Sequence, residues 1–248
     1  MTTKPRVLLV EDDSSLQRFV ALALDDLDIE LQCCADVDQA LQALAGRPAQ
    51  LILTDLMLPG RSGFDLIEML GTQPVLRAGA RLVVFSAGLT PPVRERLASH
   101  ATVWRLLSKP CSVADLEQCV SEGAGLTLSL PTPKPLAVSP EISADSVAIE
   151  RHFGGNTALY QAFRATCLRQ FHADLKAGDE ACAMADAAAL RRLAHSLKSV
   201  LLTLGHEPAS VLAHRLEDLA EQTLWPQVLG GWQALRVALV SVINDTKK

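Results

Sequence analysis

Short apolar runs alternate with segments of helical spacing over the first half of the chain. Five runs have the length and the apolar content of buried strands, and they cover residues 6–10, 29–34, 51–54, 81–85 and 102–107. The segments that follow these runs have helical spacing and several caps, and they begin near Ser14, Asp36, Gly63, Pro91 and Ser112. Strands that alternate with helices predict an α/β unit with a doubly wound, five-stranded parallel sheet.

The pattern changes at a proline-rich stretch, which we place at residues 123–143. Prolines at this density favour an extended tether over a helix, and they stand at Pro131, Pro133, Pro135 and Pro140. Beyond the tether the strand pattern disappears, and four helical stretches follow at about 156–184, 187–204, 208–222 and 227–244. Because their connections are short, we expect an antiparallel four-helix bundle. The predicted parts are therefore an α/β domain over 1–122, a tether over 123–143 and a helical domain over 144–248.

Composition narrows the possible functions. The 248 residues carry a formal net charge of −5, which argues against a nucleic-acid partner because binding a phosphate backbone needs a basic surface. The six cysteines form no C-x-x-C pair, so we expect reduced thiols rather than disulfides or a zinc site. The sequence has neither an apolar run of membrane-spanning length nor a signal-peptide pattern, and we expect a cytoplasmic chain without membrane insertion.

Polar residues follow four of the predicted strands at the same end. Glu11 and Asp12 follow the first strand and Asp55 follows the third, and such ends converge on one crevice of a parallel sheet. Three carboxylates repel one another, so a cation is favoured, and oxygen ligands suit Mg²⁺. Ser86 at the fourth strand and Lys109 after the fifth would favour phosphoryl oxygens. Each residue alone could be an ordinary polar loop residue, but together they predict a metal-dependent phosphoryl site.

A second candidate lies in the stretch "RLAHSLKSVLLTLG", residues 192–205. On a helix, His195 points roughly 170° away from the centre of the apolar stripe, so we expect its imidazole to face outward. Lys198 lies one turn further on and can attract an anion. A neutral exposed imidazole is a usable nucleophile near pH 7. The alternative is an incidental histidine on a solvated helix face. The other five histidines lack the surrounding pattern, and we interpret them as structural or solvated.

Residues 5–121 resemble the receiver domain of bacterial response regulators, a flavodoxin-like fold. The resemblance rests on the acidic pair Glu11 and Asp12, on Asp55 in "DLMLPGRSG", on Ser86 in "VVFSAG" and on Lys109 in "LLSKPC". It implies that Asp55 accepts a phosphoryl group and that Ser86 and Lys109 stabilise the product.

The same resemblance implies a metal site and a backbone feature. Asp12, Asp55 and the backbone carbonyl of Met57 would ligate Mg²⁺, with Glu11 helping directly or through water, and the bond between Lys109 and Pro110 would be cis. One departure concerns the aromatic residue that receivers often carry three positions before the lysine. This chain has Leu106 there, with Trp104 nearby on what strand alternation predicts to be the same side.

The helix of His195 resembles that of a histidine phosphotransfer domain over about residues 144–246. "AHSLKS" is similar to that family's A-H-x-L-K-G pattern, with Ser199 in place of the usual glycine, and Gly205 fits a glycine at the helix end. The resemblance implies that His195 carries a phosphoryl group and that Lys198 assists.

Together the two resemblances predict a phosphorelay intermediate of two-component signalling. A separate sensor histidine kinase would phosphorylate Asp55, and the phosphoryl group would pass through His195 to or from an aspartate of another receiver-containing protein. The chain has no recognisable ATP-binding motif, so we expect phosphotransfer without kinase activity of its own.

Two other functions fit the same residues. In the first, phosphorylation of Asp55 makes the receiver expose or cover the helical bundle for a binding partner, without chemistry at His195. In the second, Asp55 is the transient nucleophile of a phosphatase.

Overall fold

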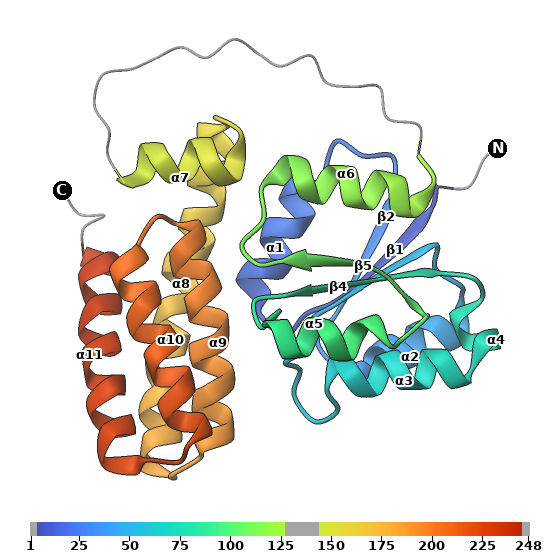
Figure 1. Ribbon diagram of the computed structural model, residues 1–248. Coiled ribbons are helices and arrows are strands. Elements are labelled where there is room, and N and C mark those ends of the chain that lie inside the picture. The colour runs from blue at the N-terminus through green and yellow to red at the C-terminus, as the bar shows by residue number, and fades with distance from the viewer. Residues whose placement is uncertain (1–3, 127–143, 245–248) are drawn as a thin grey trace. The chain divides into compact units, whose positions relative to one another are not determined.

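The computed structural model describes residues 4–126 and 144–244, which form two compact units divided between Ser143 and Ala144 (Figure 1). Each unit has its own buried core. Most of the predicted tether, residues 127–143, lies outside the described residues. Its first two residues belong to a helix that continues to Ala124.

The first unit contains the predicted parallel sheet, with strand order β2-β1-β3-β4-β5. The strands are β1 (Arg6–Val10), β2 (Glu30–Cys34), β3 (Leu51–Thr54), β4 (Arg81–Ser86) and β5 (Val103–Ser108), all within one residue of the predicted runs. Val10 pairs with Cys34 on one side and with Thr54 on the other. The register therefore ends β1, β2 and β3 at the same edge of the sheet.

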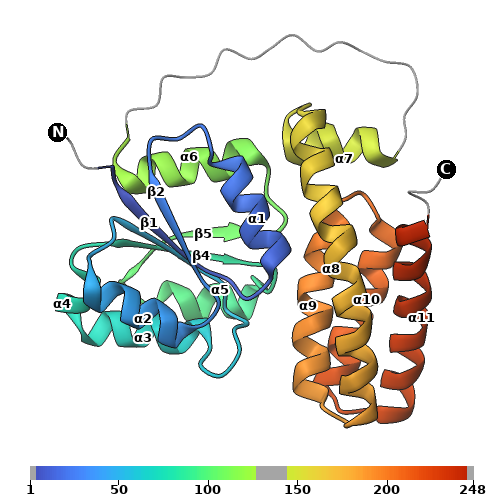
Figure 2. The same ribbon diagram turned by 180° about the vertical axis from the view of Figure 1, so that it is seen from behind.

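Helices cover both faces of this sheet, so it is doubly wound as predicted (Figures 1 and 2). One face carries α1 (Ser14–Ala23) and α6 (Val113–Ala124), and the other carries α2 (Val37–Gly46), α3 (Gly63–Thr72) and α5 (Pro91–Ala98). The side chains of Asp13, Asp36, Ser62 and Ser112 cap four of these helices. These caps fix where the loops end and the helices begin. The one-turn α4 (Pro74–Arg77) was not predicted.

Close packing fixes the start of α3 against the end of β3. A Cβ atom on Gly63 would lie 2.0 Å from the carbonyl oxygen of Asp55, so only glycine fits. The amide of Gly63 also donates a hydrogen bond to the carbonyl of Leu56 at 3.0 Å. The backbone at Asp55 and Leu56 is therefore held by the start of α3.

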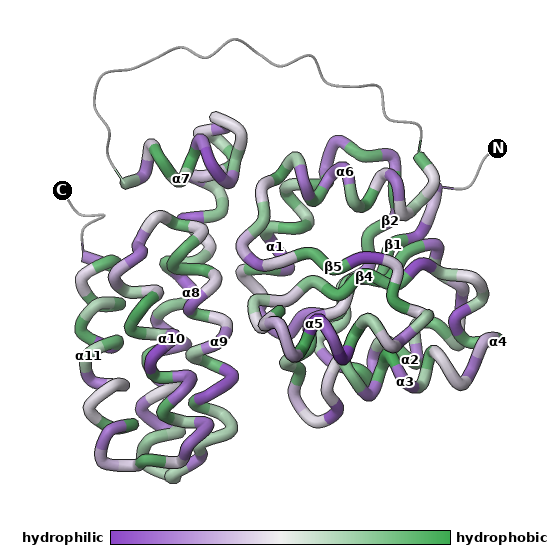
Figure 3. The backbone as a smooth tube through the Cα atoms, in the orientation of Figure 1, coloured by the Kyte–Doolittle hydropathy of each residue, from purple (hydrophilic) through white to green (hydrophobic). Residues whose placement is uncertain are grey.

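The second unit contains four long helices that pack in sequence and close on one another (Figures 1 and 2). They are α8 (Thr157–Ala183), α9 (Ala187–Thr203), α10 (Glu207–Glu221) and α11 (Trp225–Asn244), near the predicted bounds. Short connections make neighbouring helices antiparallel. Figure 3 shows hydrophilic and hydrophobic positions alternating along each helix, as amphipathic helices require.

A fifth helix, α7 (Ala144–Phe153), precedes these four, and the sequence analysis missed it. Its buried positions are Ala148, His152 and Phe153, too few to give a visible helical period. Phe153 packs edge-on against Tyr160 of α8, with ring centroids 5.3 Å apart. No described helix is both long and apolar enough to cross a membrane.

Candidate functional site

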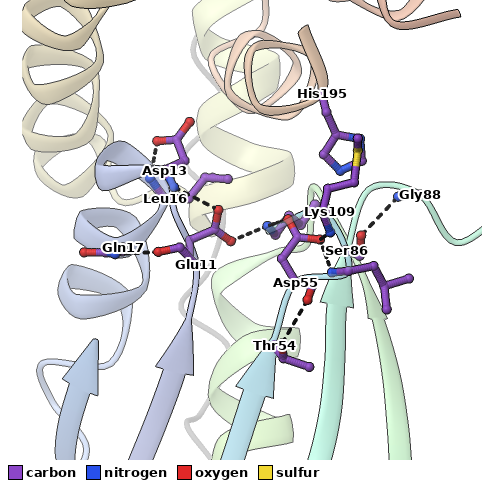
Figure 4. A network of polar contacts seen from close by, with 12 residues as sticks. Glu11, Asp13, Leu16, Gln17, Thr54, Asp55, Ser86, Gly88, Lys109 and His195 are labelled. Carbon is purple, nitrogen blue, oxygen red and sulfur yellow. Dashed lines mark hydrogen bonds and ion pairs between the residues drawn. The ribbon is translucent and has the colours of Figure 1, made fainter. Parts of the chain in front are cut away.

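The predicted acidic site forms at the carboxyl edge of the sheet. The amide of Asp55 donates to the carbonyl of Val10 at 3.0 Å, and the amide of Lys109 donates to the carbonyl of Ser86 at 3.0 Å. The ammonium of Lys109 reaches Asp55 Oδ2 at 2.6 Å and also pairs with Glu11 (Figure 4). All three side chains are buried. The structure thus brings together residues that are far apart in the sequence.

The two oxygens of Asp55 have different environments. Oδ1 accepts hydrogen bonds from the amides of Leu56 at 2.5 Å and Met57 at 3.3 Å, whereas Oδ2 faces Lys109. Ser86 is fully buried at the end of β4, and its Oγ accepts from the amide of Gly88 at 3.3 Å. The peptide bond between Lys109 and Pro110 is cis, as the resemblance implied.

Electrostatics favour a cation at this edge. Burial, together with the charge of Asp55, raises the pKa of Asp12 to about 6. Burial also raises the pKa of Glu11, with Lys109 partly offsetting this. For Lys109 burial acts to lower the pKa, but the charges of Asp55 and Glu11 outweigh it and the pKa is raised. One ammonium, in contact with Glu11 and Asp55, therefore balances the charge of three carboxyl groups only in part, so an additional positive charge would stabilise their ionised forms.

The ammonium of Lys109 lies between two of the predicted metal ligands and forms an ion pair with each of them. Its ammonium contacts both Glu11 and Asp55, and in the described parts of the chain no three His, Cys, Asp or Glu side chains are arranged to hold a metal ion. The donor set itself consists of hard oxygen atoms, which suit Mg²⁺. Ligation by Glu11, Asp12, Asp55 and the carbonyl of Met57 stays a prediction.

Asp13 has a role that the sequence analysis did not assign. Its side chain caps α1 by accepting from the amides of Ser15 at 2.7 Å and Leu16 at 3.1 Å, and its own amide donates to Glu11 at 3.2 Å. Its place directly before a helical stretch is the signal that could have identified it. Asp13 therefore orients Glu11 from the start of the helix.

A bulge in β5 changes the expected position of Trp104. Leu82 pairs with Val103 and Val83 pairs with Arg105, so Trp104 is an extra residue and the alternation predicted along this strand is wrong there. Its ring lies beneath the guanidinium groups of Arg81 and Arg105, at 4.9 and 4.4 Å. Leu106, at the position where receivers often have an aromatic residue, packs against the sheet core.

His195 lies on α9, and its environment corrects the sequence analysis. The side chain was predicted to face outward, but the residue is only 3% exposed. Its Nδ1 lies 2.7 Å from Oε1 of Glu217 on α10. The prediction treated α9 alone, so it could not include this contact with α10. Nε2 has no hydrogen-bond partner among the residues that the structure describes.

Glu217 is the functional candidate that the sequence analysis missed. Its second carboxylate oxygen, Oε2, pairs with the ammonium of Lys198, so Glu217 joins the two predicted residues of α9. Burial opposes its ionisation, but the hydrogen bonds and charges of His195 and Lys198 lower its pKa to about 2. At neutral pH Glu217 is therefore a carboxylate that accepts a hydrogen bond from Nδ1 of His195. This contact joins two helices, so no pattern within one helix could reveal it.

The helix that carries His195, α9, ends at the predicted glycine. Gly205 follows the last residues of α9 with a positive φ of 85°, and a Cβ atom there would lie 2.8 Å from the carbonyl oxygen of Ala144. The amide of His206 donates to the carbonyl of Leu201 at 2.8 Å, which closes the helix. Ser199, at the position of the usual glycine, is buried.

Each of the two units matches the model of a known domain family. The family model of the response regulator receiver domain matches residues 7–121, and that of the Hpt domain matches residues 160–242. The two matches do not overlap, and each lies within one of the two compact units. The chain consists of a response regulator receiver domain followed by a histidine phosphotransfer (Hpt) domain.

Several curated proteins are similar over most of the chain. Sensor histidine kinase GacS of Pseudomonas protegens is 25% identical over 224 residues, which are 88% of this chain and 24% of GacS. Sensory/regulatory protein RpfC of Xanthomonas campestris is 28% identical over 207 residues, 80% of this chain and 28% of RpfC. The chain thus spans about a quarter of the length of these relatives.

Solved structures of receiver domains are similar to the first unit. One is the receiver domain of sensor histidine kinase PA1611 from Pseudomonas aeruginosa, with a magnesium ion coordinated in its active-site cleft. It is 24% identical, covers 49% of this chain and 98% of its own, and has a TM-score of 0.45. Another, from a putative Luxo repressor protein of Vibrio parahaemolyticus, is 24% identical with a TM-score of 0.45, covering 49% of this chain and 91% of its own.

Proposed function

We propose that this chain is a phosphorelay intermediate that accepts a phosphoryl group on Asp55 from a separate sensor histidine kinase and exchanges it, through His195, with a receiver aspartate. The observation that carries the proposal is the state of His195: Glu217 holds Nδ1, and Nε2 has no partner in the described residues. The same chain provides an aspartate paired with a buried lysine. We assign residues 1–122 to the receiver, 123–143 to the tether and 144–248 to the phosphotransfer domain.

The first step occurs at Asp55. An oxygen of its carboxylate attacks the phosphorus of the kinase phosphohistidine, the phosphorus–nitrogen bond breaks, and an acyl phosphate forms. Lys109 already contacts Asp55 Oδ2 and would pair with the oxygens of the phosphoryl group, while Ser86 would donate its hydroxyl hydrogen. Asp12, Asp55 and the carbonyl of Met57, aided by Glu11, would hold Mg²⁺, which supplies positive charge at the phosphoryl group.

The second step uses His195 as nucleophile. Glu217 accepts from the protonated Nδ1, which leaves the lone pair of Nε2 available to attack the phosphorus of an acyl phosphate. Lys198, which contacts Glu217, lies one turn away and would attract the phosphoryl oxygens. Since the same bonds form and break in reverse, the phosphoryl group could also pass from His195 back to Asp55.

Histidine kinases and response regulators are the partners that this pair of domains implies. We place the chain in the cytoplasm because kinase and receiver domains must meet there to exchange a phosphoryl group. Chase experiments with a labelled cognate kinase would test the whole proposal, with phosphoaspartate and phosphohistidine mapped under conditions that preserve both. A phosphorylated Asp55 without any phosphohistidine at residue 195 would instead favour the alternative in which phosphorylation of Asp55 regulates the binding of a partner to the helical bundle, without chemistry at His195.

A further inference from the structure

The carboxylate of Glu217 uses both of its oxygens at the proposed phosphohistidine site. Oε1 lies 2.7 Å from Nδ1 of His195, and Oε2 pairs with the ammonium of Lys198. A neutral acceptor, such as a glutamine, would suffice to orient the imidazole. The structure provides a negative charge, and orientation alone does not explain it.

The chemistry of phosphoryl transfer shows what the charge can do. When Nε2 attacks an acyl phosphate, the N–P bond forms, the P–O bond breaks, and the aspartate leaves as a carboxylate. Nδ1 keeps its hydrogen throughout, so the phosphorylated ring has substituents on both nitrogens and carries a positive charge. In onward transfer a P–O bond forms, the N–P bond breaks, and a neutral imidazole leaves. If the ring had lost its Nδ1 proton, it would have to leave as an imidazolate anion, a much poorer leaving group.

We propose that Glu217 is a positioning residue whose negative charge retains the Nδ1 proton on phosphorylated His195, so that the ring stays a good leaving group at neutral and mildly alkaline pH. This inference rests on the proposed phosphotransfer function of His195. An opposite charge in contact with a titrating group favours its charged form, commonly by about one to three pH units. The carboxylate therefore acts in both steps: it orients the imidazole when Nε2 attacks the acyl phosphate, and it keeps the ring protonated on Nδ1 when the phosphoryl group is transferred onward.

The other charged groups near His195 do not replace this carboxylate. Arg191 lies on the same helix but pairs with Glu221 of α10 at 2.8 Å. His214 lies on α10, with its Nδ1 3.8 Å from Oε2 of Glu217. Among the residues described, no side chain other than Glu217 forms a hydrogen bond or ion pair with His195. Glu217 itself is ionised at neutral pH, since its pKa is lowered to about 2 despite its burial.

The test measures onward transfer as a function of pH. A full chain with Asp55→Asn is labelled on His195 with radioactive phosphoramidate and freed of the donor. It is then mixed with a second full chain that carries His195→Gln and an intact Asp55, in the presence of Mg²⁺. The rate of label transfer is measured from about pH 6 to about pH 9, the range in which an imidazole ring loses its proton. Because all donor variants share one acceptor, the pH dependence of the acceptor cancels in their ratios.

Glu217→Gln isolates the charge, because the amide oxygen can still accept the Nδ1 hydrogen bond. We expect the pH at which transfer falls by half to decrease by about one unit or more, with transfer about tenfold slower at the alkaline end. At the acidic end the variant and the parent should transfer at similar rates. Glu221→Gln is the matched control, because it removes the same charge one turn along α10 without touching His195, and its profile should follow that of the parent.

Several results would decide against this role. Identical pH profiles for the parent and for Glu217→Gln would show that the charge has no part in release. A folded Glu217→Gln chain that could not be labelled would also contradict it, because the ring is required to remain nucleophilic. A parent donor that takes up no label on His195 would instead contradict the proposed function itself.

Discussion

At the scale of single residues, the two proposed phosphoryl carriers are each held by one partner of opposite charge. Asp55 faces the ammonium of Lys109, and His195 faces the carboxylate of Glu217. The lysine would stabilise a group that becomes more negative on phosphorylation, whereas the glutamate would stabilise a ring that becomes positive. Each partner therefore suits the product of its own step.

Labelling with acetyl phosphate should require Mg²⁺ and Asp55. We expect Asp55→Asn to abolish the label and a chelator to reduce it at least tenfold, because the charges of Glu11, Asp12 and Asp55 would otherwise repel the donor. Incorporation of radiolabel, measured on gels that preserve acyl phosphate, gives the result. Asp38→Asn is the control, since this exposed acid pairs with Arg61 at 3.1 Å in the same unit. If the Asp55→Asn chain were still fully labelled in the receiver, Asp55 would not be the phosphoryl acceptor.

The histidine should be needed only for the second step. We expect His195→Gln to accept a phosphoryl group on Asp55 but to deliver none to a cognate downstream receiver, because an amide has no nucleophilic ring nitrogen. Lys198→Ala should still deliver, at a rate reduced by about tenfold, because it removes a positive charge and no bond-forming atom. A radiolabel chase from the kinase measures both, with folding checked by circular dichroism. Undiminished delivery by a folded His195→Gln chain would show that His195 does not carry the phosphoryl group, and would favour regulation of partner binding by phosphorylated Asp55.

At the scale of elements, the sequence predicted the features that repeat along the chain. Apolar runs followed by polar residues located Glu11, Asp55 and Lys109 at one edge of the sheet, because the ends of parallel strands coincide. The bulge at Trp104 was missed because one inserted residue shifts the alternation without changing the apolar content. Glu217 was missed because its contact with His195 depends on the register between α9 and α10, and that register follows from packing.

The contact between α9 and α10 should make the second unit sensitive to acid. The pKa of Glu217 is lowered from 4.5 to about 2, so the unfolded chain takes up the proton first as the pH falls. The stabilisation is complete above the unfolded value and is lost as the pH falls from about 4.5 toward about 2. It amounts to at most about 3 kcal/mol of unfolding free energy.

Urea unfolding at a series of pH values, followed by circular dichroism, measures this contribution. Glu217→Gln should flatten the acid limb of the stability curve, because the amide does not titrate. Glu180→Gln, an exposed acid paired with Lys176 on α8, should leave that limb in place. An unchanged acid limb in Glu217→Gln would show that the carboxylate adds no net stability.

At the scale of the whole molecule, the two proposed phosphoryl carriers, Asp55 and His195, belong to one chain, and phosphoryl transfer between them can occur within a chain or between two chains. Between the last residue of α6 and the first residue of α7 the sequence has about 20 residues, which include the prolines of the predicted tether. A flexible chain of that length has a root-mean-square span of about 25 Å, which prolines would lengthen. Such a connection allows the receiver and the phosphotransfer domain to meet, and linked partners experience an effective concentration of about 1 mM. We therefore expect transfer between Asp55 and His195 within a chain.

Mixing two variants tests this expectation. In the intact chain the rate of transfer from phosphorylated Asp55 to His195 should be independent of protein concentration. An equimolar mixture of Asp55→Asn and His195→Gln chains can transfer only between molecules, so its rate should rise in proportion to concentration and fall far below that of the intact chain in dilute solution. Quenched samples at several dilutions, separated by the acid stability of acyl phosphate and phosphohistidine, give both rates. If the mixture matched the intact chain at every dilution, transfer would be intermolecular, and the tether would serve only to keep both domains in one polypeptide.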